Sequence, residues 1–201
     1  MSQLKSTQDL KKDHITIRRI KDIASKCSNR LYETKQVPIE DIEIISVVIE
    51  EFVDRFHHVK EEKAYFPETK EKGEFSEDIR KFLIEHEFGR RIAIMLRKAV
   101  NKWKSNINGS YQDEEQKRNF LEPIARFLKT YAVFIEDHTG KEDKFFDSIE
   151  EGRIISASED ELLLMHYESC MNQAGGKIRM DQMIKLIDYL ENREWMQERS
   201  S

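Results

Sequence analysis

The segment FHHVKEEKAYF, residues 56–66, carries two adjacent histidines, and each has a glutamate four residues downstream. His57 pairs in this way with Glu61, and His58 pairs with Glu62. In an α-helix, residues four apart lie on one face, so either pair could present an imidazole and a carboxylate together. Adjacent residues lie about 100° apart, so a regular helix turns only one of the two pairs directly towards a core.

The rest of the chain is typical of a protein built from helices. Among 201 residues, 36% are charged, seven are glycine and three are proline. This balance favours long helices over strands joined by frequent turns. Breaks near Pro38, Gly73, Gly109, Gly152 and Gly175 divide the chain. We expect six helices, at about residues 7–34, 39–66, 76–105, 113–150, 159–172 and 178–195.

Long helices joined by short connections indicate antiparallel neighbours. We therefore predict an all-α fold: an up-and-down antiparallel four-helix bundle with two additional C-terminal helices. We expect residues 1–150 to form the bundle with a dinuclear metal site, and residues 151–201 to form a helical extension packed on it.

Sequence distance measures height in such a bundle, because each helical residue rises about 1.5 Å. The number of residues between His14 and the first turn is nearly the same as the number between that turn and His58. His58 and His86 lie equally far from the second turn, on opposite sides of it. With a third turn near Ser110, the distances of His86 and His138 from that turn differ by about one helical turn. Four helices therefore each bring one histidine to the same level.

Most of these side chains are expected to point inward. On the fourth helix, His138 and Glu142 fall within a stripe of apolar residues, and on the third helix His86 lies at the centre of another. His14 lies at the edge of the stripe of the first helix. All four positions are compatible with an interior site.

On the second helix, the two candidate pairs fall on different faces. His58 and Glu62 flank the apolar stripe, whereas His57 and Glu61 share a face with acidic residues. We therefore predict that His58 and Glu62 face the core and that His57 faces solvent.

The resulting set of four imidazoles and two carboxylates is suited to a pair of metal ions. Imidazole and bridging carboxylate favour iron or manganese, with zinc as an alternative. Two ferrous ions would bring four positive charges, of which the two carboxylates neutralise two. A bridging hydroxide, oxide or exogenous ligand would reduce the remaining charge of +2. Without metal, each buried carboxylate would carry a desolvation penalty of several kcal/mol. The six candidate ligands are His14, His58, Glu62, His86, His138 and Glu142.

The order H, HxxxE, H, HxxxE over residues 13–146 resembles the hemerythrin family, in its HHE cation-binding branch. The resemblance implies a four-helix bundle around a non-heme diiron centre with an oxo or hydroxo bridge. It also implies that the four histidines are terminal ligands and that Glu62 and Glu142 bridge two iron ions. The matching segments are DHITIRRI, FHHVKEEKAYFP, EHEFGRR and DHTGKEDKFF.

One position departs from the pattern of the family's oxygen carriers, in which the third-helix histidine is followed by another four residues later. Here that position is Arg90. With one histidine fewer, we expect both irons to be open, which favours reaction with oxygen, peroxide or nitric oxide over reversible oxygen storage. Arg90 could pair with a carboxylate near the irons or extend to solvent. Tyr131, on the face of His138, is interpreted as a packed core residue.

These observations give a leading hypothesis and two alternatives. The leading hypothesis is a cytoplasmic non-heme diiron protein that binds or reacts with oxygen, peroxide or nitric oxide, in sensing or detoxification, with enzymatic turnover left open. One alternative is a metal-stabilised interaction module without turnover, whose C-terminal helices bind a protein partner or a second copy. The other is iron storage or repair, although the cysteine-containing N-terminal domain of the repair proteins is absent.

Several classes of function are not expected. The net charge of −5 is spread over mixed acidic and basic runs, which gives a nucleic acid no basic surface. No apolar run approaches the roughly 20 residues that cross a bilayer, so we expect no membrane association. Cys27 and Cys170 lack CxxC spacing and are interpreted as reduced packing residues. His166, alone on the fifth helix, is expected to face solvent.

Overall fold

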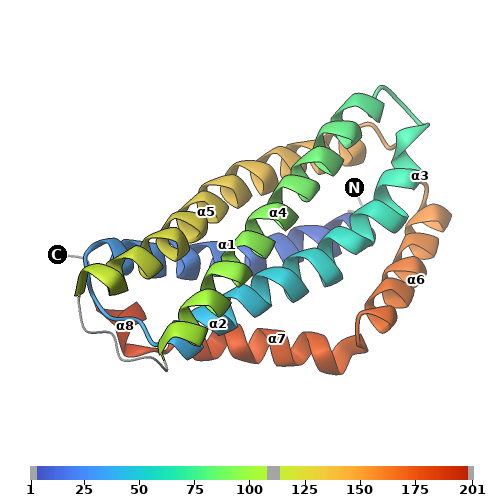
Figure 1. The fold of residues 1–201 in the computed structure, drawn as a ribbon. Helices are drawn as coiled ribbons and strands as arrows, with labels where there is room; N and C mark the ends of the chain where they lie inside the picture. Colours follow the sequence, from blue (N-terminus) through green and yellow to red (C-terminus); the bar gives the residue numbers. More distant parts are fainter. Residues whose placement is uncertain (1–3, 108–113, 199–201) are drawn as a thin grey trace.

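The computed structural model describes residues 4–107 and 114–198, and within these ranges it contains helices and no strand. The expectation of an all-helical protein is confirmed. The expected turn near Ser110 lies outside the described residues. In chain order, the elements are α1 (Lys5–Tyr32), α2 (Ile39–Val48), η1 (Ile49–His58), η2 (Glu61–Tyr65), α3 (Phe66–Lys70), α4 (Ser76–Ile107), α5 (Glu114–Glu151), α6 (Ala157–Gln173), α7 (Gly176–Glu191) and α8 (Glu194–Gln197) (Figure 1).

The second long rod changes its winding along its length. It begins as the α-helix α2 after Pro38, continues as the π-helical segments η1 and η2, and ends as α3. In a π-helix the backbone hydrogen bonds span five residues instead of four, so the turn is wider. The backbone stays in the right-handed helical region at Val48 and Val59, which flank η1, so the rod continues without a break.

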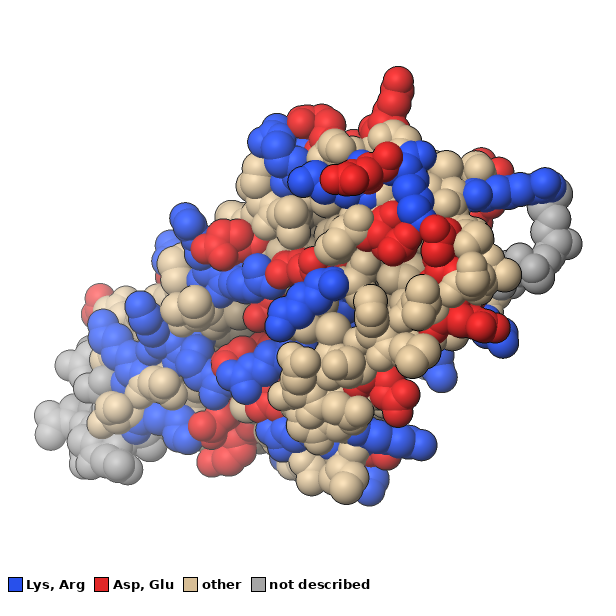
Figure 2. All heavy atoms as spheres, turned by 90° about the vertical axis from the view of Figure 1, so that its right-hand side faces the viewer, with Lys and Arg blue, Asp and Glu red and all other residues tan. Residues whose placement is uncertain are grey.

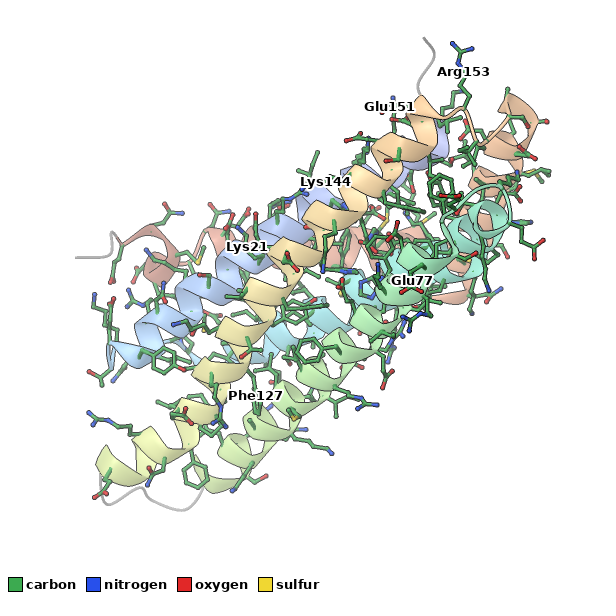
Figure 3. All side chains as sticks on the ribbon, turned by 90° about the horizontal axis from the view of Figure 1, so that it is seen from above. Lys21, Glu77, Phe127, Lys144, Glu151 and Arg153 are labelled. Carbon is green, nitrogen blue, oxygen red and sulfur yellow. The ribbon has the colours of Figure 1, made fainter. Side chains whose placement is uncertain are left out.

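The long rods pack side by side. Helix α5 packs against both α1 and α4, while the second rod contacts α1 through α2 and η1 and contacts α4 on its other side (Figure 1). Between α1 and α5 the ammonium of Lys21 lies 2.8 Å from a carboxylate oxygen of Glu136. The view from above in Figure 3 shows Lys21 on α1 beside α5, which carries Phe127 and Lys144.

Two apolar clusters fill the interior, and a polar layer separates them. On α1, Leu10 belongs to one cluster and Ile17 to the other, with His14 between them. On α5, the change of cluster occurs between Ile135 and Phe145. The buried residues of the polar layer are His14, His57, His58, Glu61, His86, His138 and Glu142.

The C-terminal helices cover the rods from outside. Helix α6 begins with a capping box in which Ser156 and Glu159 satisfy each other's backbone N–H groups. A turn at Gly175 and Gly176, with φ values of 113° and 71°, reverses the chain into α7. The apolar face of α7 enters the larger cluster, and α8 follows it. The residues that α7 and α8 bury there are Met183, Ile187, Leu190 and Trp195.

Acidic and basic side chains are interleaved on the face shown in Figure 2. Among the described residues, ion pairs join neighbouring helices, such as the one between Arg179 and Glu51 at 2.7 Å. No helix in the described ranges has the length and apolar character needed to span a bilayer.

Candidate metal centre

The polar layer brings together seven potential ligands from all four long rods. They divide into two groups, in each of which one nitrogen or carboxylate oxygen per residue lies within 4.8 Å of the others. The three-histidine group consists of His58, His86 and His138. The two-histidine group consists of His14, His57, Glu61 and Glu142.

In the two-histidine group, both imidazoles turn Nε2 towards the centre. The Nε2 atoms of His14 and His57 lie 3.1 Å apart. A carboxylate oxygen lies 3.4 Å from each of them, supplied to His14 by Glu142 and to His57 by Glu61. The group therefore offers two nitrogens and two oxygens around one point.

The three-histidine group is packed ring against ring. His58 and His86 stack with their centroids 3.8 Å apart and their planes 13° apart, and His138 meets His86 edge to face at 4.9 Å. The two carboxylates reach this group as well. Glu61 lies 3.4 Å from Nε2 of His86, and Glu142 lies 3.2 Å from Nε2 of both His86 and His138. Each glutamate thus lies between the two groups.

Several buried atoms at the centre have no hydrogen-bond partner among the described residues. They include both oxygens of Glu61, Oε2 of Glu142, Nε2 of His138 and both ring nitrogens of His58. Leaving such groups unpaired costs several kcal/mol for a carboxylate and less for an imidazole. Divalent cations would coordinate these same atoms, so the donor set fits a pair of metal ions.

Burial and neighbouring charges act in opposite directions on Glu142. Burial alone would raise the pKa of this carboxyl group. The imidazoles of His138, His14 and His86 outweigh burial and hold the pKa well below its usual range. Glu142 is therefore an ionised carboxylate, the form that binds a cation.

The two adjacent histidines differ in their electrostatic surroundings. Burial alone would lower the pKa of His57, but the carboxylates of Glu61 and Asp13 raise it to about 10. Burial and the neighbouring imidazole of His86 lower the pKa of His58 well below its usual value. His58 is therefore neutral, the form in which an imidazole is a metal ligand.

On each of the four rods, Nδ1 of one histidine contacts a carboxylate. The carboxylate belongs to the rod that comes before it in the chain, and the first rod receives its carboxylate from the last. We call Asp13, Glu62, Glu85 and Asp143 the carboxylate ring. Such contacts fix the tautomer and orientation of metal-binding histidines and leave Nε2 free for the cation. Asp13 of α1 lies 3.4 Å from Nδ1 of His57, Glu62 of η2 lies 2.7 Å from that of His86, Glu85 of α4 lies 2.8 Å from that of His138, and Asp143 of α5 lies 2.7 Å from that of His14.

Each member of the carboxylate ring is also held by a cationic side chain. These ion pairs keep the supporting carboxylates in place and balance their charge. Lys60 binds Asp13 at 2.7 Å, Arg90 binds Glu62 at 2.6 Å, Lys141 binds Glu85 and Arg18 binds Asp143.

Five of the six residues predicted as ligands lie in the two groups: His14, His58, His86, His138 and Glu142. His14, expected at the edge of its stripe, is fully buried. The remaining candidate, Glu62, joins neither group, and its side chain is 23% exposed. Glu61 lies between the groups at the level where Glu62 was expected.

The expectation that His57 and Glu61 lie on a solvated face is wrong. Their exposed fractions are 1% and 0%. The expectation used the angular spacing of an α-helix, whereas η1 and η2 are π-helical, so each residue turns through a smaller angle. His57 and His58 therefore both reach the interior, so the polar layer contains five histidines where four were expected.

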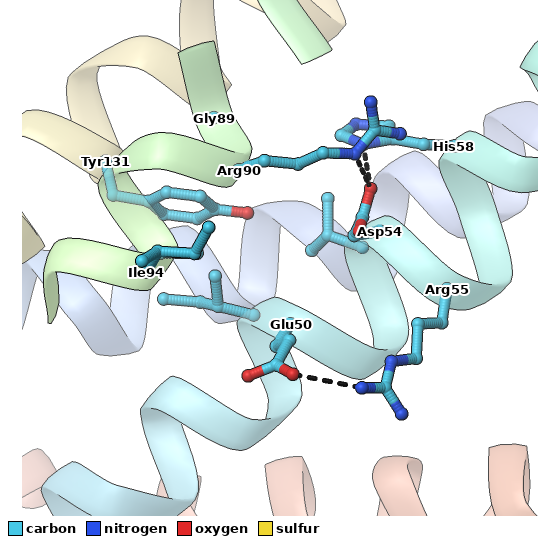
Figure 4. A pocket seen from close by; sticks show the side chains of 11 residues that line it. Glu50, Asp54, Arg55, His58, Gly89, Arg90, Ile94 and Tyr131 are labelled. Carbon is cyan, nitrogen blue, oxygen red and sulfur yellow. Dashed lines mark hydrogen bonds and ion pairs between the residues drawn. The ribbon is translucent and has the colours of Figure 1, made fainter. Parts of the chain in front are cut away.

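Arg90 was expected either to pair with a carboxylate or to extend to solvent, and it pairs with carboxylates. It spans Asp54 and Glu62, with 2.6 Å contacts to both. A cavity of about 200 Å³ opens beside Arg90 and is lined in part by His58 and Tyr131 (Figure 4). Tyr131 is buried, as predicted, and His166 is exposed.

The carboxylate ring was not predicted, although the sequence carries a signal for it. Each of its members is adjacent in sequence to a residue of the two groups: Asp13 precedes His14, Glu85 precedes His86, Glu62 follows Glu61 and Asp143 follows Glu142. An acid beside a buried ligand lies at the edge of the helix face and can reach the next rod.

The comparisons with known proteins agree with this geometry. A sequence model of the hemerythrin HHE cation-binding domain matches residues 5–149, which include all seven residues of the two groups. The comparison with curated proteins and the comparison with solved structures each found no match.

Proposed function

Because the chain belongs to the hemerythrin family, whose HHE domain binds cations, we propose that the polar layer holds a non-heme diiron centre that binds or reacts with oxygen, peroxide or nitric oxide. The observation that carries this proposal is the pair of carboxylates between five buried imidazoles with unpaired central atoms. Imidazole and carboxylate donors without thiolate suit iron.

The allocation of ligands follows the two groups. One iron would be held by His58, His86 and His138, and the other by His14 and His57. Glu61 and Glu142 would bridge them, since each contacts both groups. This assignment replaces Glu62 by Glu61 and adds His57 as a fifth histidine.

The two halves of the site differ by one imidazole, and this difference indicates where an external ligand binds. With both glutamates shared, the two-histidine side has one protein ligand fewer. We therefore expect the open position on the side of His14 and His57 instead of on both sides. Iron in this site would supply reversible one-electron oxidation next to an exchangeable position.

The protein's own residues would control protons and orientation there. Asp13 accepts a hydrogen bond from Nδ1 of His57 and pairs with Lys60. Asp143 accepts a hydrogen bond from Nδ1 of His14 and pairs with Arg18. These contacts direct Nε2 of both imidazoles at the centre, where each would release any proton it carries when a metal ion binds. Full burial of His14 and Glu142 excludes bulk water from the centre.

We also propose that residues 1–150 form an up-and-down four-helix bundle and that residues 151–201 form an extension packed on it. The contacts of α1 with α5, of α4 with α5, and of α2 and η1 with α1 and α4 support this division. We propose that this role, sensing or detoxification, is carried out in the cytoplasm.

The test combines metal analysis with spectroscopy. Protein loaded with ferrous iron without oxygen is expected to hold two irons per chain. Mixing it with oxygen, peroxide or nitric oxide should produce new absorption in the near-ultraviolet and visible range. A chain that takes up no iron, or loaded protein whose spectrum none of the three ligands changes, would contradict the proposal.

A metal-stabilised interaction module remains a second candidate because α6 exposes apolar side chains. Leu162 and Met165 are 54% and 66% exposed. Sedimentation of the iron-loaded wild type and of a Leu162→Ser, Met165→Ser double variant would test self-association through this face. Equal masses for the two proteins would exclude self-association through α6.

A further inference from the structure

The cavity beside Arg90 adjoins the three-histidine group, because His58 belongs to that group and also lines the cavity. It lies between η1 and α4, with Tyr131 of α5 at its inner end (Figure 4). Its volume is about 200 Å³. An apolar cavity of about 150 Å³ in another protein holds benzene, so this space exceeds the needs of a diatomic molecule.

The cavity exists because side chains on α4 are small where those on η1 are branched. Gly89 and Ala93 face Ile49 and Val53 across it. A Cβ atom on Gly89 would lie 2.8 Å from Cε1 of Phe134, so packing against that ring keeps this position small. The body of the cavity is therefore apolar.

Three polar features line the same space. The hydroxyl of Tyr131 projects into it and forms no hydrogen bond with the other lining side chains (Figure 4). The imidazole of His58, a residue that is 3% exposed, also lines the cavity; its Nδ1 lies 3.5 Å from Oδ1 of Asp54, and neither ring nitrogen has a hydrogen-bond partner among the described residues. Arg90 and Asp54, bound to each other at 2.6 Å, form part of the wall.

The charges around the cavity compensate one another. Arg90 is paired with Asp54, and Arg55 is paired with Glu50 at 3.1 Å. The charged lining residues therefore carry no net charge that would attract an ion, and an uncharged ligand leaves both pairs intact. An apolar body with a single hydroxyl group would match the walls and give Tyr131 a partner.

We infer that this cavity binds a small uncharged organic molecule, of about the size of an aromatic ring and bearing one hydroxyl group, against His58. The inference goes beyond the proposed function, because it assigns a second ligand site on the three-histidine side, away from the position expected to be open on the side of His14 and His57. The bound molecule would contact the outer side of a metal-binding imidazole.

Phenol and toluene are suitable probes, because they differ by one hydroxyl group at similar size. Binding to the full chain is measured by equilibrium dialysis, once as iron-loaded protein and once after metal removal. Wild type should bind both probes. Ala93→Leu, which fills the cavity, should lose at least tenfold in affinity for both. Val133→Leu adds the same kind of bulk at an exposed position of α5 and should bind like wild type.

Tyr131→Phe removes one oxygen atom and tests the polar half of the inference without altering the fold. Phenol should bind this variant about fivefold more weakly, while toluene should bind it as it binds wild type. The inference is overturned if neither probe binds wild type up to its solubility, if Ala93→Leu binds as well as wild type, or if Tyr131→Phe weakens both probes equally. Metal analysis of the same samples reports separately on the diiron proposal.

Discussion

Glu61 and Glu62 are neighbours in sequence but have different surroundings. Glu61 is fully buried between the two groups of imidazoles, and neither of its oxygens is hydrogen-bonded within the described chain. Glu62 lies one residue further round the rod, where it accepts hydrogen bonds from His86 and Arg90. Glu61 is therefore suited to bind a metal ion, whereas Glu62 is suited to orient a histidine that binds one.

Replacing each glutamate by glutamine tests this distinction with almost no change in shape. Glu61→Gln should reduce the bound iron below two per chain, because the amide is a poor bridge. Glu62→Gln should keep two irons per chain with an affinity lower by about 10- to 100-fold, as for other residues that support ligands. Iron analysis and competition with a chelator measure both. Full occupancy in Glu61→Gln combined with loss in Glu62→Gln would reverse the assignment.

Two glycines on neighbouring helices give a matched pair for stability. At Gly89 an added Cβ would lie 2.8 Å from Phe134, whose ring stacks on His138 with centroids 5.3 Å apart. At Gly140 nothing lies within 4 Å of the added atom. Gly89→Ala should therefore destabilise the protein by about 1–3 kcal/mol through overpacking. Gly140→Ala should stabilise it by up to about 1 kcal/mol through helix propensity. Urea unfolding of the two variants measures the difference; stabilisation by both would show that Phe134 moves freely.

At the scale of elements, the π-helical segments decide which side chains enter the site. A regular α-helix would carry one of the two adjacent histidines away from the interior. In η1 both are buried, at 1% and 3% exposure for His57 and His58. One histidine belongs to each group, so this single rod would supply a ligand to both halves of the proposed centre.

Alanine at each of these two histidines should therefore have a comparable effect. His57→Ala and His58→Ala should each lower iron affinity or occupancy, whereas an α-helical rod would make one of them dispensable. His166→Ala, at an exposed histidine of α6, is the control and should leave occupancy unchanged. Iron-to-protein ratios after anaerobic loading give the comparison. Wild-type occupancy in either variant of the adjacent pair would contradict the five-histidine assignment.

The sequence predicts most of the fold and much of the site for physical reasons that hold along ordinary α-helices. The constant rise per residue brings His14, His86 and His138 to one level, and the apolar stripe of α5 directs Glu142 inward. The second rod escapes prediction because nothing in IEEFVDRFHH distinguishes four-residue from five-residue hydrogen bonding. That choice depends on how neighbouring rods pack, and it moves the predicted carboxylate by one position, from Glu62 to Glu61.

At the scale of the whole molecule, the carboxylate ring links every rod to the next. Each rod supplies both a histidine with Nε2 directed inward and an acid that orients the histidine of its neighbour. The order of the links is α1 to η1, η2 to α4, α4 to α5, and α5 back to α1. The orientation of the inward-facing imidazoles therefore depends on how the rods pack against one another.

Removing one link should weaken metal binding without removing a ligand. Asp143→Asn should lower iron affinity by about 10- to 100-fold, because the amide no longer stabilises the required orientation and charge of His14. Asp22→Asn, at an exposed aspartate of α1, is the matched control. Chelator competition measures both affinities. Identical affinities in the two variants would show that the ring has no influence on the metal.

The C-terminal helices should contribute strongly to stability. Met183 on α7 is fully buried in the larger apolar cluster, whereas Met165 on α6 is 66% exposed. Met183→Ala should lower the free energy of unfolding by about 2–5 kcal/mol, and Met165→Ala should change it by less than about 0.5 kcal/mol. Chemical denaturation followed by circular dichroism separates them. A chain ended at Glu151 that kept its Tm would instead mark residues 152–201 as an independent unit.

The circular order of the carboxylate ring has a consequence for biosynthesis. The last link in the chain is Asp143, and it orients the first histidine, His14. During translation the early rods emerge with some of their imidazoles still unsupported, so a nascent polypeptide lacks a complete cage. Under the proposed function, the full set of ligands would therefore be present only after α5, which carries His138 and Glu142, has been synthesised.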